Sequence, residues 1–281
     1  MKIGVQIRPT DYSIHPAEIA RMVESAGFES LFFPEHTHIP LATSSLEPEN
    51  PGWLETCMHM LDPFIALMAA GAATERLRLG TGVSLILEHD PIVLAKEVAT
   101  LDRLCGGRFL FGVGAGWNEV EMRHHGIDPT RRWAMLGEYV RVVRALWTEE
   151  RAEFHGRFVD FSPSFQWPKP LQRPHPPILI GGEGPRVLDR VIEFGDAWVP
   201  NEHDGVEERV LELSSRVAAE KRPAIPVTVY SCEWDRARLE RYAELGVDRC
   251  VYTIPAFDVD GIERGLHELR RLTADLSTET G

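Results

Sequence analysis

The feature that most constrains the fold is an alternation of short apolar runs with longer helical patterns along the whole chain. Eight runs are continuous and largely apolar, which is typical of strands buried on both faces of a parallel sheet. They are Ile3–Ile7, Ser30–Phe33, Leu77–Val83, Phe109–Val113, Ile178–Ile180, Ala197–Val199, Val227–Tyr230 and Cys250–Thr253. Eight strands alternating with helices over about 250 residues predict a closed (β/α)8 TIM barrel, and an open doubly wound sheet is the alternative.

The segments between the strands carry helix signals. Asp62-Pro63 and Asp90-Pro91 each pair an N-cap acid with a proline at the first helical position. Glycines 27, 195 and 246 follow helix ends, where a left-handed residue is expected. Besides the two helices after Asp62 and Asp90, the pattern predicts Pro16–Ala26, Arg131–Trp147, Pro185–Phe194, Val206–Ala219, Asp235–Leu245 and Val259–Leu272. We expect one domain over residues 1–281, because no linker-like run interrupts this alternation.

Two connections are too long for simple turns. Thr37–Leu61 follows the second strand, and Glu150–Pro177 precedes the fifth and is rich in aromatic residues and prolines. Long ordered insertions commonly form lids or binding walls. We therefore expect both to shape a substrate pocket, with a packing flap at an oligomer interface as the alternative for the second.

Charge and composition exclude several classes of protein. Thirty Lys and Arg against 43 Asp and Glu give a net charge of −13, which disfavours sequence-independent binding of nucleic acid. No apolar run approaches the roughly 18 residues of a membrane helix. The chain enters a strand-like run at once and its four cysteines form no C-x-x-C pair, so we expect a cytoplasmic protein with neither secretion signal nor disulfides.

The exit of the second strand carries the strongest candidates for chemistry. Glu35, His36 and His38 follow a buried strand, and in a barrel the loops after strands form the catalytic face. Histidine can exchange protons near neutral pH or bind a metal. A metal site would use His36 with His38, and a proton-transfer or cofactor-contact site would use His36 alone. No further ligands converge at the other strand ends, so we predict no metal.

Three other strand exits are rich in glycine. Thr81-Gly82-Val83 closes the third strand, where glycine indicates a bulge or the close approach of a ligand. The fourth continues into Gly114-Ala115-Gly116-Trp117-Asn118, whose glycine spacing departs from the dinucleotide-binding fingerprint, so a nicotinamide-binding open-sheet domain is disfavoured. Asn118 is a candidate N-cap for a following helix.

The exit of the fifth strand has the pattern of an anion site. Gly181-Gly182-Glu183-Gly184 opens into a predicted helix that begins with Pro185. Free backbone N–H groups at a helix N-terminus favour a phosphate, and Arg186 can add a charge-assisted hydrogen bond. Together these exits would suit a flat cofactor with a phosphate, laid across the barrel mouth, which performs the redox step itself.

The same segments resemble the bacterial luciferase-like flavin and deazaflavin oxidoreductase superfamily. The resemblance rests on residues 32–40, 77–83, 95–108, 112–119 and 174–182, and residues 34–40 (PEHTHIP) look most like the branch that uses coenzyme F420. It implies a non-prolyl cis peptide at Gly82-Val83 or Val83-Ser84 behind the cofactor ring. It also implies that His36 contacts the ring or substrate, with Glu35 beside it, and that Gly181–Gly184 hold the phosphate.

The resemblance leaves the cofactor and substrate open. Hydride transfer between F420 and an unknown small organic molecule is the first hypothesis, and an FMN-dependent monooxygenase, a flavoprotein of the same fold, is the second. Lys169, Arg173 and Arg186 are candidates to meet the anionic tail of F420. A metal-dependent barrel hydrolase and a carrier without turnover are less favoured, and a homodimer is one oligomeric state that the resemblance allows.

Overall fold

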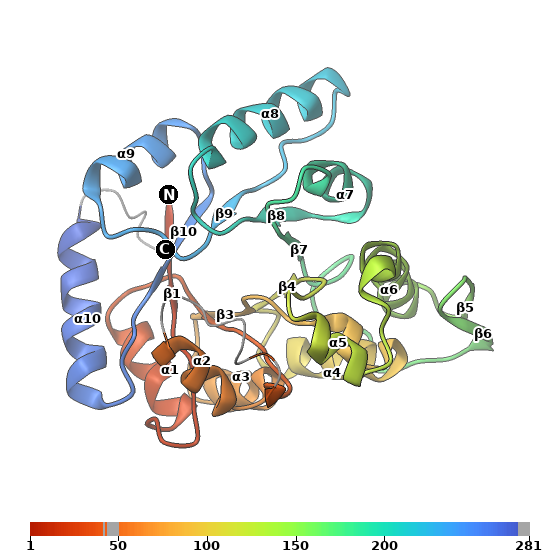
Figure 1. Cartoon of the computed structure of the whole chain (residues 1–281), viewed down its shortest axis with the longest axis horizontal. Coiled ribbons are helices and arrows are strands. Elements are labelled where there is room, and N and C mark those ends of the chain that lie inside the picture. Colours follow the sequence, from red (N-terminus) through yellow and green to blue (C-terminus); the bar gives the residue numbers. More distant parts are fainter. Residues whose placement is uncertain (42, 44–50, 275–281) are drawn as a thin grey trace.

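The eight strands form one parallel sheet that curls into a nearly closed barrel. The structure, a computed structural model, describes residues 1–41, 43 and 51–274. Hydrogen-bonded neighbours follow the order β8-β7-β4-β3-β2-β1-β10-β9 (Figure 1). Bridges from Trp198 to Val227 and from Asn201 to Tyr230 join the two edge strands. The predicted barrel is confirmed, and the open-sheet alternative is wrong because the first and last strands of the order meet. The strands are β1 Lys2–Gln6, β2 Ser30–Phe33, β3 Arg78–Thr81, β4 Phe109–Val113, β7 Ile178–Gly181, β8 Ala197–Val199, β9 Thr228–Val229 and β10 Arg249–Thr253.

Helices cover the outside of this barrel, near the predicted positions. Asp62 and Asp90 cap their helices as expected: each carboxylate accepts a hydrogen bond from a backbone N–H of the first turn. The larger helices are α1 Pro16–Ser25, α3 Pro63–Ala72, α4 Pro91–Leu104, α6 Arg132–Thr148, α7 Val187–Phe194, α8 Val206–Ala219, α9 Arg236–Glu244 and α10 Val259–Leu272. Two short helices, α2 Pro51–Met58 and α5 Glu119–His124, lie in loops after strands; α2 was not predicted, and α5 is the helix for which Asn118 was the candidate N-cap.

Two local predictions about helix ends were wrong. The helix after β7 begins at Val187, so Pro185 lies before it rather than at its first position. Gly195 has φ −94°, which is not left-handed. Close packing explains this glycine instead, because a Cβ there would lie 2.7 Å from the side chain of Ile180. Gly27 and Gly246 have the expected positive φ.

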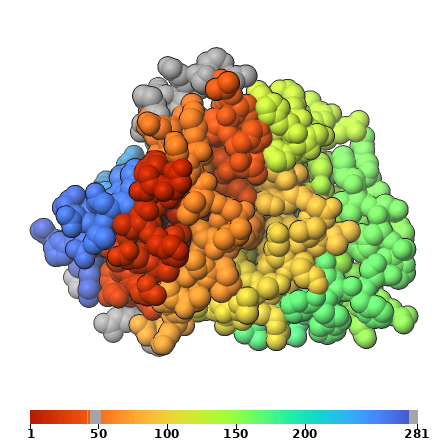
Figure 2. All heavy atoms as spheres, turned by 90° about the horizontal axis from the view of Figure 1, so that it is seen from below, coloured from red at the N-terminus to blue at the C-terminus, as the bar shows by residue number. Residues whose placement is uncertain are grey.

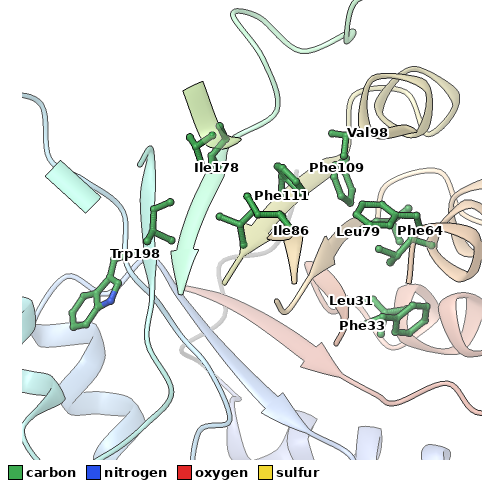
Figure 3. Close-up of a cluster of buried hydrophobic side chains, with 14 of the residues drawn as sticks. Leu31, Phe33, Phe64, Leu79, Ile86, Val98, Phe109, Phe111, Ile178 and Trp198 are labelled. Atoms are coloured by element: carbon green, nitrogen blue, oxygen red, sulfur yellow. The ribbon is translucent and has the colours of Figure 1, made fainter. Parts of the chain in front are cut away.

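Alternate residues of the strands build two separate apolar layers. Leu31 and Phe33 of β2, and Phe109 and Phe111 of β4, point outward toward α3 and α4, as Figure 3 shows. Phe32 points the opposite way, into a smaller cluster inside the barrel. Figure 2 shows the segments of α1, α3 and α4 side by side on one face of the molecule. Because both faces of each strand are buried, the strand sequences are continuous apolar runs.

The second insertion forms an antiparallel hairpin of β5 Ala152–His155 and β6 Asp160–Ser164, beyond α6 (Figure 1). The carboxylate of Glu138 on α6 accepts hydrogen bonds from three backbone N–H groups of its turn. The prediction that Glu150–Pro177 shapes the substrate pocket was wrong. None of its residues lines the cavity described below, and its hairpin and the segment after it pack on the outside of α6 and α4. Residues 42 and 44–50 of the first insertion lie outside the described residues.

Candidate active site

A cavity of about 390 Å³ lies where β3, β4 and β7 end. Because the strands are parallel, their carboxyl ends meet at one end of the barrel. Ten of the predicted site residues line the cavity: Gly82, Val83, Gly114, Ala115, Gly116, Trp117, Gly181, Gly182, Glu183 and Gly184. Five others do not line it: Glu35, His36, Thr81, Asn118 and Arg186. The glycine-bearing exits thus come together as one concave surface.

The floor of the cavity is the loop that follows β3. The peptide bond between Gly82 and Val83 is cis, as the resemblance implied. The side chain of Val83 fits between two neighbouring exits: a Cβ on Gly114 would lie 2.7 Å from it, and one on Gly181 would lie 3.2 Å from it. Glycine is therefore required at Gly114 for close packing. The result is a floor made of backbone and one small side chain, which a flat ring can cover.

The loop after β7 forms one wall. Gly182 has φ +118°, a conformation that residues with a Cβ rarely adopt. The carboxylate of Glu183 accepts hydrogen bonds from the backbone and side-chain N–H groups of Asn201, at 2.8 and 3.0 Å. Its charge is thereby directed toward the exit of β8. Arg186 is exposed, 3.7 Å from Asp189, and stays a proposed anion contact.

Two residues at the start of α6 complete this wall, and the sequence analysis missed them. Arg132 and Trp133 line the cavity, and Arg190 of α7 stacks on Trp133 with its guanidinium carbon 4.0 Å from the ring centre. Within the described ranges, neither arginine has a carboxylate at ion-pair distance. Burial and the positive charges of Arg186 and Arg132 lower the pKa of Arg190. An anion bound here would relieve that repulsion.

Two of the predicted basic groups lie elsewhere. The ammonium of Lys169 is 2.7 Å from the carbonyl oxygen of Leu146 and also donates to the carbonyl of Glu149, so it caps the C-terminal end of α6. Lys169 and Arg173 both belong to the second insertion, none of whose residues lines the cavity. The prediction that they meet a cofactor tail was wrong for that reason.

His36 lies beside the cavity and is held by a buried carboxylate. Its Nδ1 is 2.8 Å from Oε2 of Glu121, and the two side chains are 7% and 1% exposed. The indole N–H of Trp117 donates to Nε2 at 3.3 Å. Since an indole nitrogen only donates, Nε2 is an acceptor here and Nδ1 carries the proton shared with Glu121. Trp53 packs edge-on against the same imidazole.

Glu121, which the sequence analysis did not single out, sits on α5. Burial works to raise its pKa, but the hydrogen bonds from His36 and from the backbone outweigh burial and lower it. Glu121 is therefore a carboxylate at neutral pH, and it fixes both the tautomer and the orientation of His36. The only sequence signal was its position three residues after the N-cap Asn118.

Glu35 connects the exit of β2 to the loop that follows β3. Its two oxygens accept hydrogen bonds from the hydroxyl of Ser84 at 2.7 Å, the backbone N–H of Leu85 at 2.6 Å and the imidazole of His89 at 2.8 Å. Burial opposes protonation of His89, but its bond to Glu35 outweighs burial and raises its pKa. Glu35 thus ties the exit of β2 to the segment after the cis peptide.

The remaining predicted residues have structural contacts. Thr81 donates its hydroxyl proton to the carbonyl of Gly112 at 2.7 Å, which joins β3 to β4. Asn118 caps α5, as predicted. His38 contacts His124, with 2.9 Å between Nε2 and Nδ1. Within residues 1–41, 43 and 51–274, no group of three His, Cys, Asp or Glu side chains is arranged to hold a metal.

Comparison with known proteins decides the family. The family model for luciferase-like monooxygenases matches residues 12–249. The chain belongs to the luciferase-like monooxygenase family. An uncharacterised family relative from Mycobacterium tuberculosis is 41% identical over 266 residues, which is 92% of this chain and 94% of that protein. None of the described helices is long and apolar enough to cross a membrane.

Proteins that this chain resembles use different cofactors. An FMNH2-dependent dimethylsulfone monooxygenase from Pseudomonas putida is 33% identical over 155 residues, covering 53% of this chain and 42% of that protein. The solved structure of an F420-dependent secondary alcohol dehydrogenase, in complex with an F420-acetone adduct, has a TM-score of 0.74 at 19% identity and covers 98% of this chain and 99% of that chain. At that identity the likeness supports the fold alone.

Proposed function

We propose that this luciferase-like protein is an oxidoreductase that transfers hydride between coenzyme F420 and a small organic substrate. The carrying observation is the pair Arg132 and Arg190, which flank Trp133 at the outer side of the glycine wall. FMN ends in a single phosphate, whereas the phosphate of F420 continues into an anionic tail. Positive charge beyond the phosphate-sized Gly181–Gly184 loop therefore favours F420.

The residues around the cavity fit such a cofactor. Among the described residues, Arg132 Nε and the hydroxyl of Tyr230 are buried without a hydrogen-bond partner, and both residues line the cavity. The glycine floor leaves room for a flat ring. Gly181–Gly184 and Arg132 would hold the phosphate and tail. When bound, the cofactor supplies the ring carbon that gives or takes the hydride.

The residues of the chain then perform three tasks. The floor at Val83 sets the plane in which the ring lies. Trp53 and Trp117 flank His36 and limit the access of water to it. His36 keeps Nδ1 on Glu121, and a substrate hydroxyl that displaces the indole N–H of Trp117 can give its proton to Nε2 or take one back.

An FMN-dependent monooxygenase is the second candidate, and the relative from Pseudomonas putida favours it. An FMN phosphate would use the same Gly181–Gly184 loop. The two candidates differ beyond that phosphate, because FMN has no further anionic group for Arg132 and Arg190 to bind.

Fluorescence titration of the purified protein with F420, with its tail-less deazaflavin riboside and with FMN tests the proposal. We expect F420 to bind most tightly. Arg132→Met and Arg190→Met should each weaken F420 binding about tenfold, the value of one charge-assisted contact, and leave the riboside unaffected. Arg141→Met, on the same helix but paired with Glu193, is the control and should not weaken binding. Tighter binding of FMN would support the monooxygenase, and no binding of any of the three at millimolar concentration would contradict both candidates.

A further inference from the structure

A second buried carboxyl group lies behind the His36–Glu121 pair. Glu88 follows the cis-peptide loop, and its side chain is 2% exposed. The hydroxyl of Thr37 donates to its Oε2 at 2.9 Å, and His125 is 3.5 Å from the same oxygen. In the described part of the chain, no Lys or Arg lies within ion-pair distance of Glu88.

Thr37 connects Glu88 to Glu121. Its backbone N–H donates to Oε1 of Glu121 at 3.1 Å, and its hydroxyl lies 3.4 Å from the same oxygen. Two carboxyl groups therefore meet at one hydroxyl. Two like charges in such a buried position repel each other, so the pair is stable when only one of them is ionised.

The surroundings decide which one keeps the proton. Burial raises the pKa of Glu88 to about 8, and the negative charges of Glu121 and Glu35 act in the same direction. Thr37 and His89 act in the opposite direction. The facing groups on α5 and directly after it are Glu121 and His125. The pKa of Glu121 is lowered, chiefly because the hydrogen bond from His36 outweighs burial. At neutral pH Glu88 is the acid and Glu121 the carboxylate.

We propose that Glu88 is a positioning residue for His36: as a neutral acid joined to Glu121 through Thr37, it keeps a single negative charge behind the imidazole. This inference rests on the proposed function, in which His36 exchanges the substrate proton. A structural need alone does not explain Glu88, because a buried acid that has, among the described residues, no Lys or Arg beside it and only His125 at 3.5 Å is costly where Gln would fit. Ionisation of Glu88 places a second charge at Thr37 and drives the two carboxylates apart, which releases the orientation of His36.

The kinetic test compares pH profiles of kcat. The wild-type kcat should fall about fivefold or more as the pH rises through 8, because the two ionised carboxylates repel each other. Glu88→Gln keeps the neutral shape and should lose this alkaline fall. Thr37→Val should lower kcat while Thr37→Ser, which retains the hydroxyl, restores it. An alkaline limb that is the same in Glu88→Gln and wild type, or equal rates for the two Thr37 variants, would overturn the proposal.

A second test needs no cofactor and so separates this inference from the proposed function. A carboxyl whose pKa is raised in the folded state weakens folding as pH rises from its ordinary value of 4.5 to about 8. Glu88→Gln lacks this loss, so its Tm relative to wild type should be about 5 °C higher at pH 8.5 than at pH 5. The control Glu119→Gln, an exposed residue of α5, should show no such difference.

A third test follows the NMR signal of the His36 ring against pH in the cofactor-free protein. The wild-type His36 signal should show an inflection near pH 8 that is absent in Glu88→Gln, because Glu88 ionises there. If the His36 signal depends on pH in the same way in wild type and in Glu88→Gln, the link through Thr37 is wrong. If the inflection is present but no cofactor supports turnover, the proposed function fails and the carboxyl pair stands.

Discussion

Replacement of His36 by alanine is expected to lower kcat about 100- to 1000-fold, within the range that general acid–base catalysis contributes. His36 lies next to the cavity without lining it. Its Nε2 accepts the indole N–H of Trp117 and is the imidazole nitrogen that can take a substrate proton once Trp117 gives up that bond. The Kd of the cofactor should change less than about threefold, because the phosphate and ring contacts come from other strands. Steady-state kinetics and binding titration measure the two effects separately.

The control for this variant is His155→Ala. His155 lies on the β5–β6 hairpin outside α6, paired with Asp160 on the surface, and does not line the cavity. Its kcat should equal that of the wild type. An unchanged kcat in His36→Ala, or a loss that saturating cofactor restores in full, would contradict the role assigned to His36.

Breaking the buried ion pair between Glu29 and Arg249 is expected to destabilise the protein by about 3–5 kcal/mol, as for other buried pairs that lose one partner. The guanidinium makes two hydrogen bonds to the carboxylate, at 2.8 and 2.7 Å, and the side chains are 9% and 4% exposed. Arg249 also donates to Thr228, so the pair connects the residue before β2 with β10 and β9, across β1. Glu29→Gln leaves the buried arginine without a counter-charge.

Urea denaturation of Glu29→Gln checks this value. Lys2→Met breaks the neighbouring but exposed pair with Asp248 and should cost less than about 1 kcal/mol. The double variant Glu29→Leu with Arg249→Met should recover much of the loss, since it removes both charges. A loss in Glu29→Gln no larger than that of Lys2→Met would show that the buried pair contributes little.

The same pair gives stability a dependence on pH. Burial alone would raise the pKa of Glu29, but the hydrogen bonds and charge of Arg249 outweigh burial and lower it. A carboxyl with a lowered pKa stabilises the fold above its unfolded value near 4.5, and this contribution is lost as pH falls through the folded value. The pKa of Glu88 is raised rather than lowered. The stability of Glu88→Gln should therefore differ most from wild type at alkaline pH, and that of Glu29→Gln should lose its difference from wild type at acidic pH.

The barrel could be predicted from the sequence because each strand and each strand exit is marked by residues that are neighbours in the chain. Each buried strand is a short apolar run, and the glycines at Gly82, Gly114 and Gly181 mark the exits that converge. The parallel topology then fixes that all these exits share one end. The error about the second insertion came from its composition, which is that of a binding wall, whereas its residues pack on the outside of α6 and α4 and none lines the cavity.

The partners of the site could not be predicted, because they depend on contacts between residues far apart in the chain. Glu121 meets His36 across 85 positions, and a carboxylate on a short helix gives no local signal. Arg132 and Trp133 open a long helix and look like ordinary surface residues in sequence. The two neighbours Glu35 and His36 also point in different directions, one into the supporting loop and the other toward Glu121, which a motif alone does not reveal.

A crystal structure of the protein soaked with F420 is the most direct test of the central claim, that the glycine-bearing strand ends together hold a flat, phosphate-bearing redox cofactor. We expect density for the ring on Val83, for the phosphate on Gly181–Gly184, and for the tail along Arg132 and Trp133, with His36 facing the ring edge. Density for the cofactor elsewhere on the barrel, or a ring kept away from Val83 with its phosphate away from Gly181–Gly184, would contradict the account.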